Sequence, residues 1–179
     1  ISNYLYKQLS GEPMFPPTVT LAYEKVQEMR YGENPHQAGA FYRELGATPG
    51  CLTDAVQLHG KELSYNNIND TNGALDLLRE FKETAVVCCK HANPCGVGVG
   101  ETVYDAYMKA YTADPMSVFG GIVVTNAVID EATAAEMHKI FLEIIVAPDF
   151  TPEAIKTLTY KKPSLRLLKL DTTHREYPE

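Results

Sequence analysis

The chain has 179 residues, of which 45% are apolar and 22% charged, as in an ordinary globular protein with one domain or two small ones. Its net charge of −7 argues against nucleic acid or an anionic membrane as a partner, because both attract basic surfaces. No apolar stretch reaches the length of a membrane span, and the four cysteines lack the spacing of a disulfide framework. The sequence therefore predicts a cytoplasmic protein without disulfides.

The first half of the chain is predicted to alternate strands with a helix. Residues 38–45 have the composition of a short strand, and apolar residues at helical spacing predict a helix over 70–81 with Asp70 as its N-cap. A buried strand over 85–89 follows at once. The glycines of 96–100 lack the spacing of a phosphate-binding loop, and they favour a flexible turn.

The second half continues the alternation. In chain order it predicts a helix that stops at Asp114-Pro115, a buried strand over 120–124, a helical stripe over 134–145, a strand over 144–147, a helix from Thr151-Pro152 and a strand over 164–170. Helices that alternate with short strands rich in Val and Ile indicate the α/β class. We expect a layered, mixed or largely parallel sheet with flanking helices.

Lys90 and His91 directly follow the predicted strand over 85–89, and ligands in α/β sheets bind beyond the carboxyl ends of strands. Lysine supplies a positive charge, and histidine exchanges protons near neutral pH. The pair suits a reaction that deprotonates a weak nucleophile and stabilises an oxyanion. Asn93, Pro94 and Gly96 are expected to fix the loop that presents the pair. The alternative is a surface lysine beside a structural histidine.

A zinc site is a second interpretation of the same segment, because cysteines lie close to His91. Zinc deaminases combine the patterns H-x-E and P-C-x-x-C, with the Glu as proton shuttle. In this sequence Asn93 stands at the position of that Glu, and Gly98 at the position of the second Cys. The sequence therefore predicts no catalytic metal.

Residues 30–37, RYGENPHQ, gather polar and aromatic side chains around one bend. Arg30 could bind a phosphate or a carboxamide, and Tyr31 could stack on a ring. An ordinary capping loop is the alternative interpretation.

Five segments carry a family resemblance. They are RYGENPHQ (30–37), ELSYNNINDTNGAL (62–75), KHANPCG (90–96), AYTADPMSVFGG (110–121) and FLEIIVAPDF (141–150). In this order and spacing they closely resemble the transformylase domain of the AICAR transformylase/IMP cyclohydrolase family, and the match covers nearly the whole chain. The resemblance implies two subdomains of cytidine deaminase-like fold. Residues 18–179 would form the first and lack the second, and residues 1–17 would connect to a preceding cyclohydrolase domain.

The resemblance also implies an activity, a formyltransferase step of de novo purine (IMP) biosynthesis. The formyl group of the co-substrate 10-formyltetrahydrofolate would pass to the exocyclic 5-amino group of AICAR. His91 would transfer the proton of that amine, and Lys90 would stabilise the transition state. The implied AICAR-binding residues are Arg30, Tyr31, His91, Phe119, Gly120 and Glu143. Glu143 stands where some relatives carry Asp.

Relatives in this family form intertwined homodimers whose sites use both chains. The second subdomain would supply a catalytic asparagine and much of the folate pocket, and the preceding domain the cyclohydrolase activity. We therefore expect the chain alone to be impaired or inactive in formyl transfer. Two other functions stay open: a non-catalytic nucleotide-binding or dimerisation module, and a relative of the zinc deaminases.

Overall fold

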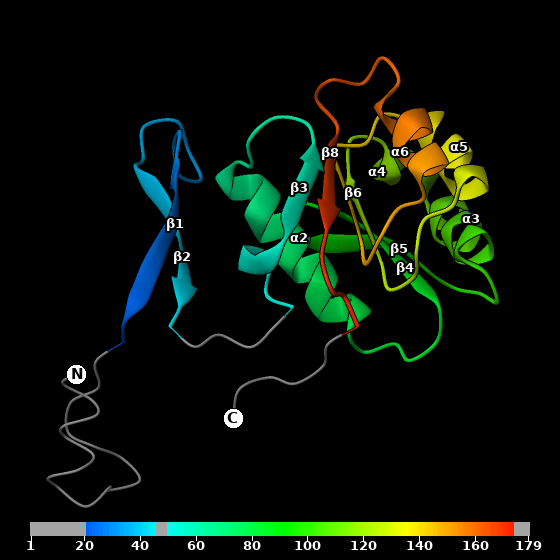
Figure 1. Cartoon of the computed structure of the whole chain (residues 1–179), viewed down its shortest axis with the longest axis horizontal. Helices are drawn as coiled ribbons and strands as arrows, with labels where there is room; N and C mark the ends of the chain where they lie inside the picture. Colours follow the sequence, from blue (N-terminus) through cyan, green and yellow to red (C-terminus); the bar gives the residue numbers. More distant parts are fainter. Residues whose placement is uncertain (1–20, 46–49, 174–179) are drawn as a thin grey trace, which may run out of the picture.

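A computed structural model describes residues 21–45 and 50–173. Its central layer is a six-stranded sheet of order β3-β8-β7-β6-β4-β5, and a two-stranded ribbon, β1-β2, lies beside it (Figure 1). Strands β6, β7 and β8 are parallel, whereas β3 is antiparallel to β8, and β4 is antiparallel to both β5 and β6. The predicted α/β class with a mixed sheet and flanking helices is confirmed, and the likeness to cytidine deaminase stays a prediction.

The strands are β1 (Tyr23–Met29), β2 (Gly39–Glu44), β3 (Val56–His59), β4 (Ala85–Lys90), β5 (Asn93–Val99), β6 (Ile122–Thr125), β7 (Ile144–Ala147) and β8 (Arg166–Lys169). The helices are the 3-10 turn η1 (Leu52–Asp54), α2 (Tyr65–Leu78), α3 (Val103–Ala113), α4 (Pro115–Val118), α5 (Glu131–His138) and α6 (Pro152–Thr159). The predicted strands over 38–45, 85–89, 120–124, 144–147 and 164–170 are thereby confirmed.

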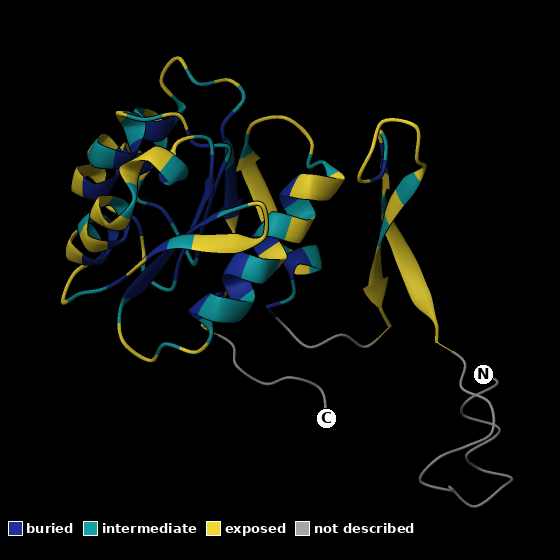
Figure 2. Ribbon diagram, turned by 180° about the vertical axis from the view of Figure 1, so that it is seen from behind, coloured by how far each residue is buried: buried dark blue, intermediate teal, exposed yellow. Residues whose placement is uncertain are grey.

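Helices cover both faces of the sheet. Helices α3, α5 and α6 pack on one face and α2 on the other (Figure 1). Strand β4 supplies both cores, because successive side chains of a strand point to opposite faces. Val86 and Cys88 belong to the core under α3, whereas Val87 and Cys89 belong to the core under α2. Figure 2 shows the middle strands of the sheet as the buried centre of the molecule, whereas β3 and β5 at its two edges are largely exposed.

Helix α2 begins earlier than the sequence predicts. Ser64, not Asp70, is its N-cap: the Ser64 Oγ accepts a hydrogen bond from the Asn67 N–H at 3.2 Å, and the Asn67 side chain accepts one from the Ser64 N–H at 3.1 Å. This reciprocal pair is a capping box. The first turn of the helix is rich in amides and poor in apolar residues, so the hydrophobic pattern finds the helix late and extends it past its end at Leu78.

The helical stripe predicted over 134–145 also ends early. Helix α5 stops at His138, and Ile145 lies in strand β7. The Lys162 ammonium group donates hydrogen bonds to the carbonyl oxygens of His138, at 2.6 Å, and Ile140, which satisfies backbone acceptors at the end of the helix. The predicted start of α6 is confirmed, since the Thr151 Oγ1 accepts a hydrogen bond from the Ala154 N–H at 3.1 Å.

The glycines of 96–100 form no flexible turn; they lie in or next to strand β5, which pairs with β4. A Cβ atom at Gly96 would lie 2.0 Å from the Ala110 carbonyl oxygen, and one at Gly98 would lie 2.0 Å from the Ala106 carbonyl oxygen. Both contacts are far shorter than van der Waals distance. The glycines therefore let helix α3 pack directly on β5.

The ribbon of β1 and β2 is largely exposed (Figure 2). Phe41 packs against the core under α2, and the Gln27 Nε2 donates a hydrogen bond to the Leu63 carbonyl oxygen at 3.3 Å. These contacts bring the turn that follows β1 toward the sheet. The connection predicted for residues 1–17 lies outside the described residues. Within the described ranges, no helix is both long and apolar enough to cross a membrane.

Candidate active site

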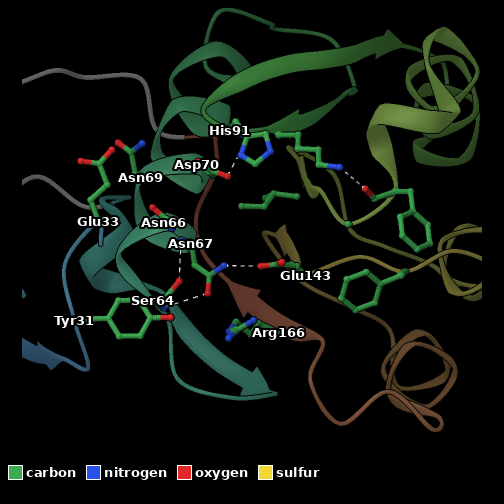
Figure 3. Close-up of a pocket in the computed structure, with 15 residues that line it drawn as sticks. Tyr31, Glu33, Ser64, Asn66, Asn67, Asn69, Asp70, His91, Glu143 and Arg166 are labelled. Carbon is green, nitrogen blue, oxygen red and sulfur yellow. Dashed lines mark hydrogen bonds between the residues drawn. The ribbon is translucent and has the colours of Figure 1, made fainter. Parts of the chain in front are cut away.

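A cavity of about 730 Å³ opens at one edge of the six-stranded sheet (Figure 3). Strand β4 ends at this edge, whereas β6, β7 and β8 begin there, because β4 runs against β6 while the other three strands are parallel. The cavity therefore lies beyond the carboxyl end of β4, where the sequence places Lys90 and His91, but at the amino ends of the three parallel strands. The antiparallel pairing of β4 with β6 thus brings residues from the carboxyl end of β4 next to residues from the amino ends of β6, β7 and β8.

Most of the side chains selected from the sequence meet at this cavity. Those that line it are Tyr31, Lys90, His91, Phe119, Gly120 and Glu143. Arg30 lines a smaller cavity of about 360 Å³ next to it, and Tyr31, Ser64 and Arg166 line both cavities. Residues more than 100 positions apart in the chain are thus neighbours in space.

Lys90 and His91 lie where β4 turns into β5. His91 and Ala92 form the whole connection, and both have positive φ, 54° and 57°. Two central residues with positive φ are typical of a type I′ hairpin turn. The expectation that Asn93, Pro94 and Gly96 form a loop is wrong, because all three lie in β5. Register pairing with β4 leaves no room for a longer connection.

Polar contacts hold this turn in place. The His91 backbone N–H donates a hydrogen bond to the Asp70 carboxylate at 3.1 Å, and the Asn93 side-chain amide donates one to the His91 carbonyl oxygen at 2.7 Å. The Lys90 ammonium group donates a hydrogen bond to the Phe119 carbonyl oxygen at 3.0 Å. The imidazole of His91, which is exposed, is therefore carried by a backbone that is fixed on both sides.

The amide-rich start of α2 forms a wall of the cavity that the sequence analysis did not single out. It contributes Ser64, Asn66, Asn67, Asn69 and Asp70. Asn67 is buried, and its Nδ2 donates a hydrogen bond to the Glu143 carboxylate at 2.9 Å (Figure 3). The segment YNNIND, with three asparagines and an aspartate in six residues, was the available signal.

Arg166 is a further residue of the cavity lining that the sequence did not indicate. It begins strand β8, and its Nε donates hydrogen bonds to the carbonyl oxygens of Lys61, at 3.1 Å, and Glu62, at 3.0 Å. Burial lowers the pKa of the Arg166 guanidinium, while the negative charge of Glu143 opposes that effect. Nothing in the local pattern of a short strand distinguishes this arginine from a solvent-facing one.

An aromatic pair lies at another wall of the cavity. The rings of Phe119 and Phe141 are tilted, with centroids 5.8 Å apart, and both side chains are about half exposed. The Gly120 N–H donates a hydrogen bond to the Phe141 carbonyl oxygen at 2.8 Å, and Gly120 has a φ of 73°. Gly120 thus permits the turn that brings both rings together. Exposed aromatic faces offer a flat ligand a surface for stacking.

The cysteines near His91 are packing residues in this structure. Burial, foremost, raises the pKa of the Cys88 and Cys89 thiols, the latter to about 11, and it also raises that of Cys95. A thiol with a raised pKa is a poor source of the thiolate that metals and electrophiles require. Within the described part of the chain, no three His, Cys, Asp or Glu side chains gather so that they could hold a metal ion.

The fold is that of an α/β protein with a polar cavity at the edge of a mixed sheet. Comparison of the sequence identifies the family: its model, described as AICARFT/IMPCHase bienzyme, matches residues 1–179. The chain belongs to this family, as the five motifs predict.

Curated relatives agree with the family model. The chain is 58% identical over 179 residues to the bifunctional purine biosynthesis protein PurH of Acetivibrio thermocellus, and the match covers all of this chain and 34% of the relative. It is 60% identical over 171 residues to PurH of Ruminiclostridium cellulolyticum, which covers 96% of this chain and 33% of the relative. The chain thus spans about a third of the length of the relatives that it matches.

Proposed function

We propose that this chain takes part in purine biosynthesis and carries part of the site that transfers a formyl group from 10-formyltetrahydrofolate to the 5-amino group of AICAR. The observation that carries the proposal is the gathering of Lys90, His91, Phe119, Gly120 and Glu143 around one cavity, although they come from separate segments of the chain. The cavity volume of about 730 Å³ is within the range of small-molecule sites.

His91 is the proposed proton acceptor. The amine nitrogen of AICAR attacks the formyl carbon, its proton passes to the His91 imidazole, and the bond from that carbon to N10 of the folate then breaks. The leaving N10 takes up that proton from the His91 imidazolium as the pair of bonding electrons returns to it, so the imidazole is neutral again. A conjugated amine is a weak nucleophile, so removal of its proton during attack lowers the barrier. The solvent-accessible imidazole at the tip of a hairpin fixed by Asp70 and Asn93 suits this role.

Lys90 is the proposed stabiliser of the negative charge that develops on the formyl oxygen. Lys90 is partly buried as a residue, and its ammonium group donates a hydrogen bond to the Phe119 carbonyl oxygen. An ammonium group has three donors, so the charge and two further donors remain for a ligand. A cation fixed in advance beside the reacting atoms stabilises a transition state more than a mobile one does.

AICAR would bind between α2 and the starts of the parallel strands. Glu143 would accept hydrogen bonds from the ribose hydroxyl groups, with its carboxylate oriented by Asn67. Tyr31 and Phe119 would contact the ring, and the backbone of Gly120 would approach the ligand closely. Arg30, from the smaller cavity, would contact the far end of the nucleotide. No step of this scheme uses a metal.

The remaining parts of the proposal concern the whole protein. We propose that the chain acts in the cytoplasm as part of a polypeptide of the relatives' length, that this polypeptide forms a homodimer, and that its remainder completes the folate pocket. Formyl transfer by the 179-residue chain alone is then weak or absent, while AICAR still binds to it.

The proposal is tested by two measurements on one set of variants. In the full-length protein, His91→Ala should lower the turnover of formyl transfer by about 10²- to 10⁴-fold, the usual contribution of a general acid or base. His59→Gln is the matched control, because the His59 Nε2 contacts the Lys162 carbonyl oxygen, at 3.1 Å, and His59 is not among the residues that line the cavity. Near-wild-type turnover of His91→Ala would refute the role of the imidazole.

Calorimetric titration of the 179-residue chain with AICAR separates the proposal from its rivals. Binding without turnover by the chain, together with loss of turnover in full-length His91→Ala, agrees with the proposal. If the chain binds AICAR but the full-length protein does not transfer a formyl group to it, the chain would instead be a non-catalytic nucleotide-binding module. Stoichiometric zinc in a metal assay would favour a relative of the deaminases.

A further inference from the structure

The turn between β4 and β5 is strained and exposed, although it carries the proposed proton acceptor. His91 and Ala92 are both exposed and have positive φ, 54° and 57°, a conformation that residues other than glycine adopt at a cost. The strand pairing next to the turn is also irregular, because the register of β4 with β5 shifts between Cys88 and Cys89. A strained conformation persists only where its surroundings hold it.

Side chains provide the hydrogen-bond partners of the His91 backbone. The strand register pairs Lys90 with Asn93, and His91 lies between them without a partner across the hairpin. The His91 carbonyl oxygen accepts a hydrogen bond from the Asn93 side chain at 2.7 Å, and the His91 N–H donates one to the Asp70 carboxylate at 3.1 Å. Asn93 belongs to the hairpin itself, whereas Asp70 belongs to α2. The contact with Asp70 therefore ties the turn to a separate element of the fold.

Helix α2 is a firm support for this contact. Its first turn is closed by the capping box at Ser64, and its apolar residues are buried in the core under α2. An ideal Cβ atom at Gly73 would lie 3.4 Å from the Ala92 carbonyl oxygen, so the helix passes directly beside the turn. Residues three positions apart share a face of a helix. Asp70 and Gly73 therefore face the turn together.

The same face of α2 also holds the carboxylate proposed to bind the ribose. Asn67, three residues before Asp70, donates its hydrogen bond to Glu143 at 2.9 Å. Asp70 is half-buried at the wall of the cavity, and Figure 3 shows its hydrogen bond with His91. Among the described residues, the Asp70 carboxylate has no second hydrogen bond and no ion pair. One helix thus fixes Glu143 and His91 relative to each other.

We propose that Asp70 is a positioning residue for formyl transfer, because its carboxylate holds the His91 backbone in the conformation in which the imidazole lines the cavity. The inference rests on the proposed function for the role of that imidazole. Asp70 acts through His91 and contacts no reacting atom. Its removal therefore lowers turnover rather than the affinity for AICAR, since the groups proposed to bind the nucleotide lie elsewhere along the edge of the sheet.

Steady-state kinetics of the full-length protein test this role. Asp70→Ala should lower kcat on the order of 10- to 100-fold, the value of a hydrogen bond to a charged group, and leave the KM for AICAR unchanged. Asp70→Asn should recover most of the turnover, because its amide oxygen can accept the same hydrogen bond. A rise in KM without a loss of kcat would make Asp70 a ligand-binding residue and overturn the proposal. So would equally slow turnover in Asp70→Asn and Asp70→Ala.

A double-mutant cycle separates positioning from a general structural role. In a His91→Ala background, Asp70→Ala should cause no further loss of turnover, since no imidazole is left to position. A further loss as large as that in the wild-type background would overturn the proposal. The matched control is Asp76→Ala, which removes a carboxylate of the same helix that accepts hydrogen bonds from Asn72 and Arg79 and does not line the cavity. It should leave turnover unchanged in the wild-type background.

Nuclear magnetic resonance of the labelled 179-residue chain distinguishes failure of this inference from failure of the proposed reaction. The Cα and Cβ chemical shifts of His91 report its backbone conformation without any catalysis. They should lose their left-handed values in Asp70→Ala and keep them in Asp76→Ala, and unchanged values in Asp70→Ala would overturn the proposal. If the values are lost but His91→Ala keeps wild-type turnover, the contact holds the turn and the proposed proton transfer falls. If His91→Ala loses turnover and Asp70→Ala does not, the proposed reaction stands and this inference falls.

Discussion

Replacement of Ala92 by glycine is expected to stabilise the protein. Ala92 is the second residue of the two-residue turn between β4 and β5, with a φ of 57°. Type I′ turns favour glycine at this place, because a residue with a Cβ is strained at positive φ. Ala92 is exposed, and its contact with Gly73 is made by its carbonyl oxygen, which lies 3.4 Å from an ideal Cβ at Gly73. The substitution removes no buried methyl group and no backbone partner.

The magnitude follows from two opposing terms. The left-handed conformation costs a residue other than glycine roughly 1–2 kcal/mol, and this cost disappears in Ala92→Gly. Glycine also has more conformational freedom in the unfolded chain, which lowers the free energy of unfolding by about 0.5–1 kcal/mol. The free energy of unfolding should therefore rise by about 0.5–1 kcal/mol. In a chain of this size, that gain raises the melting temperature by roughly 1–4 °C.

Urea unfolding followed by circular dichroism measures this change. The control is Ala135→Gly, an exposed alanine in the interior of α5, where glycine should lower the free energy of unfolding by about 1 kcal/mol. The two substitutions remove the same methyl group and should shift stability in opposite directions. A loss of stability in Ala92→Gly similar to that in Ala135→Gly would show that the turn does not strain Ala92.

Two further predictions concern the packing around β4. Gly98→Ala should lower the free energy of unfolding by about 3 kcal/mol or more in urea, because its Cβ would lie 2.0 Å from the Ala106 carbonyl oxygen, whereas the control Gly73→Ala should leave stability equal or higher. Burial raises the Cys89 pKa to about 11, so stability is complete below the ordinary cysteine pKa of about 8.5 and should fall as the pH rises toward 11. Cys89→Ala should flatten that decline in urea unfolding measured across the window, and an unchanged slope would contradict the assignment.

Apolar patterning predicts β4, β6, β7 and β8 because these strands are largely buried, but it predicts neither β3 nor β5, which are largely exposed. Every residue of 85–89 is buried, so the strand is a continuous apolar run with no alternation to misread. Apolar patterning misplaces a helix start where polar side chains form hydrogen bonds with residues far away in the sequence. The first turn of α2 carries Asn67 for Glu143, and the helix therefore begins with amides that no apolar pattern contains.

The segment 96–100 fails for a different reason. Glycine marks both turns and close backbone contacts, and sequence spacing alone does not separate the two. Here Gly96 and Gly98 face α3, a helix whose approach to β5 depends on the tertiary structure. The positions of Lys90 and His91 at a strand end followed from the sequence, but the two-residue turn that carries His91 did not.

The direction of β4 relative to β6 decides which residues meet at the candidate site, and no local sequence pattern predicts it. Had β4 been parallel to β6, Lys90 and His91 would lie at the opposite edge of the sheet from Gly120, Glu143 and Arg166. The antiparallel pairing of β4 with β6 places the ends of one strand and the starts of three others at one edge. Charges of opposite sign can then alternate along that edge at the spacing of the strands. Residues at the ends of successive strands would contact successive parts of a ligand that lies along this edge. We therefore expect substitutions at the ends of different strands to weaken contacts with different parts of the same ligand.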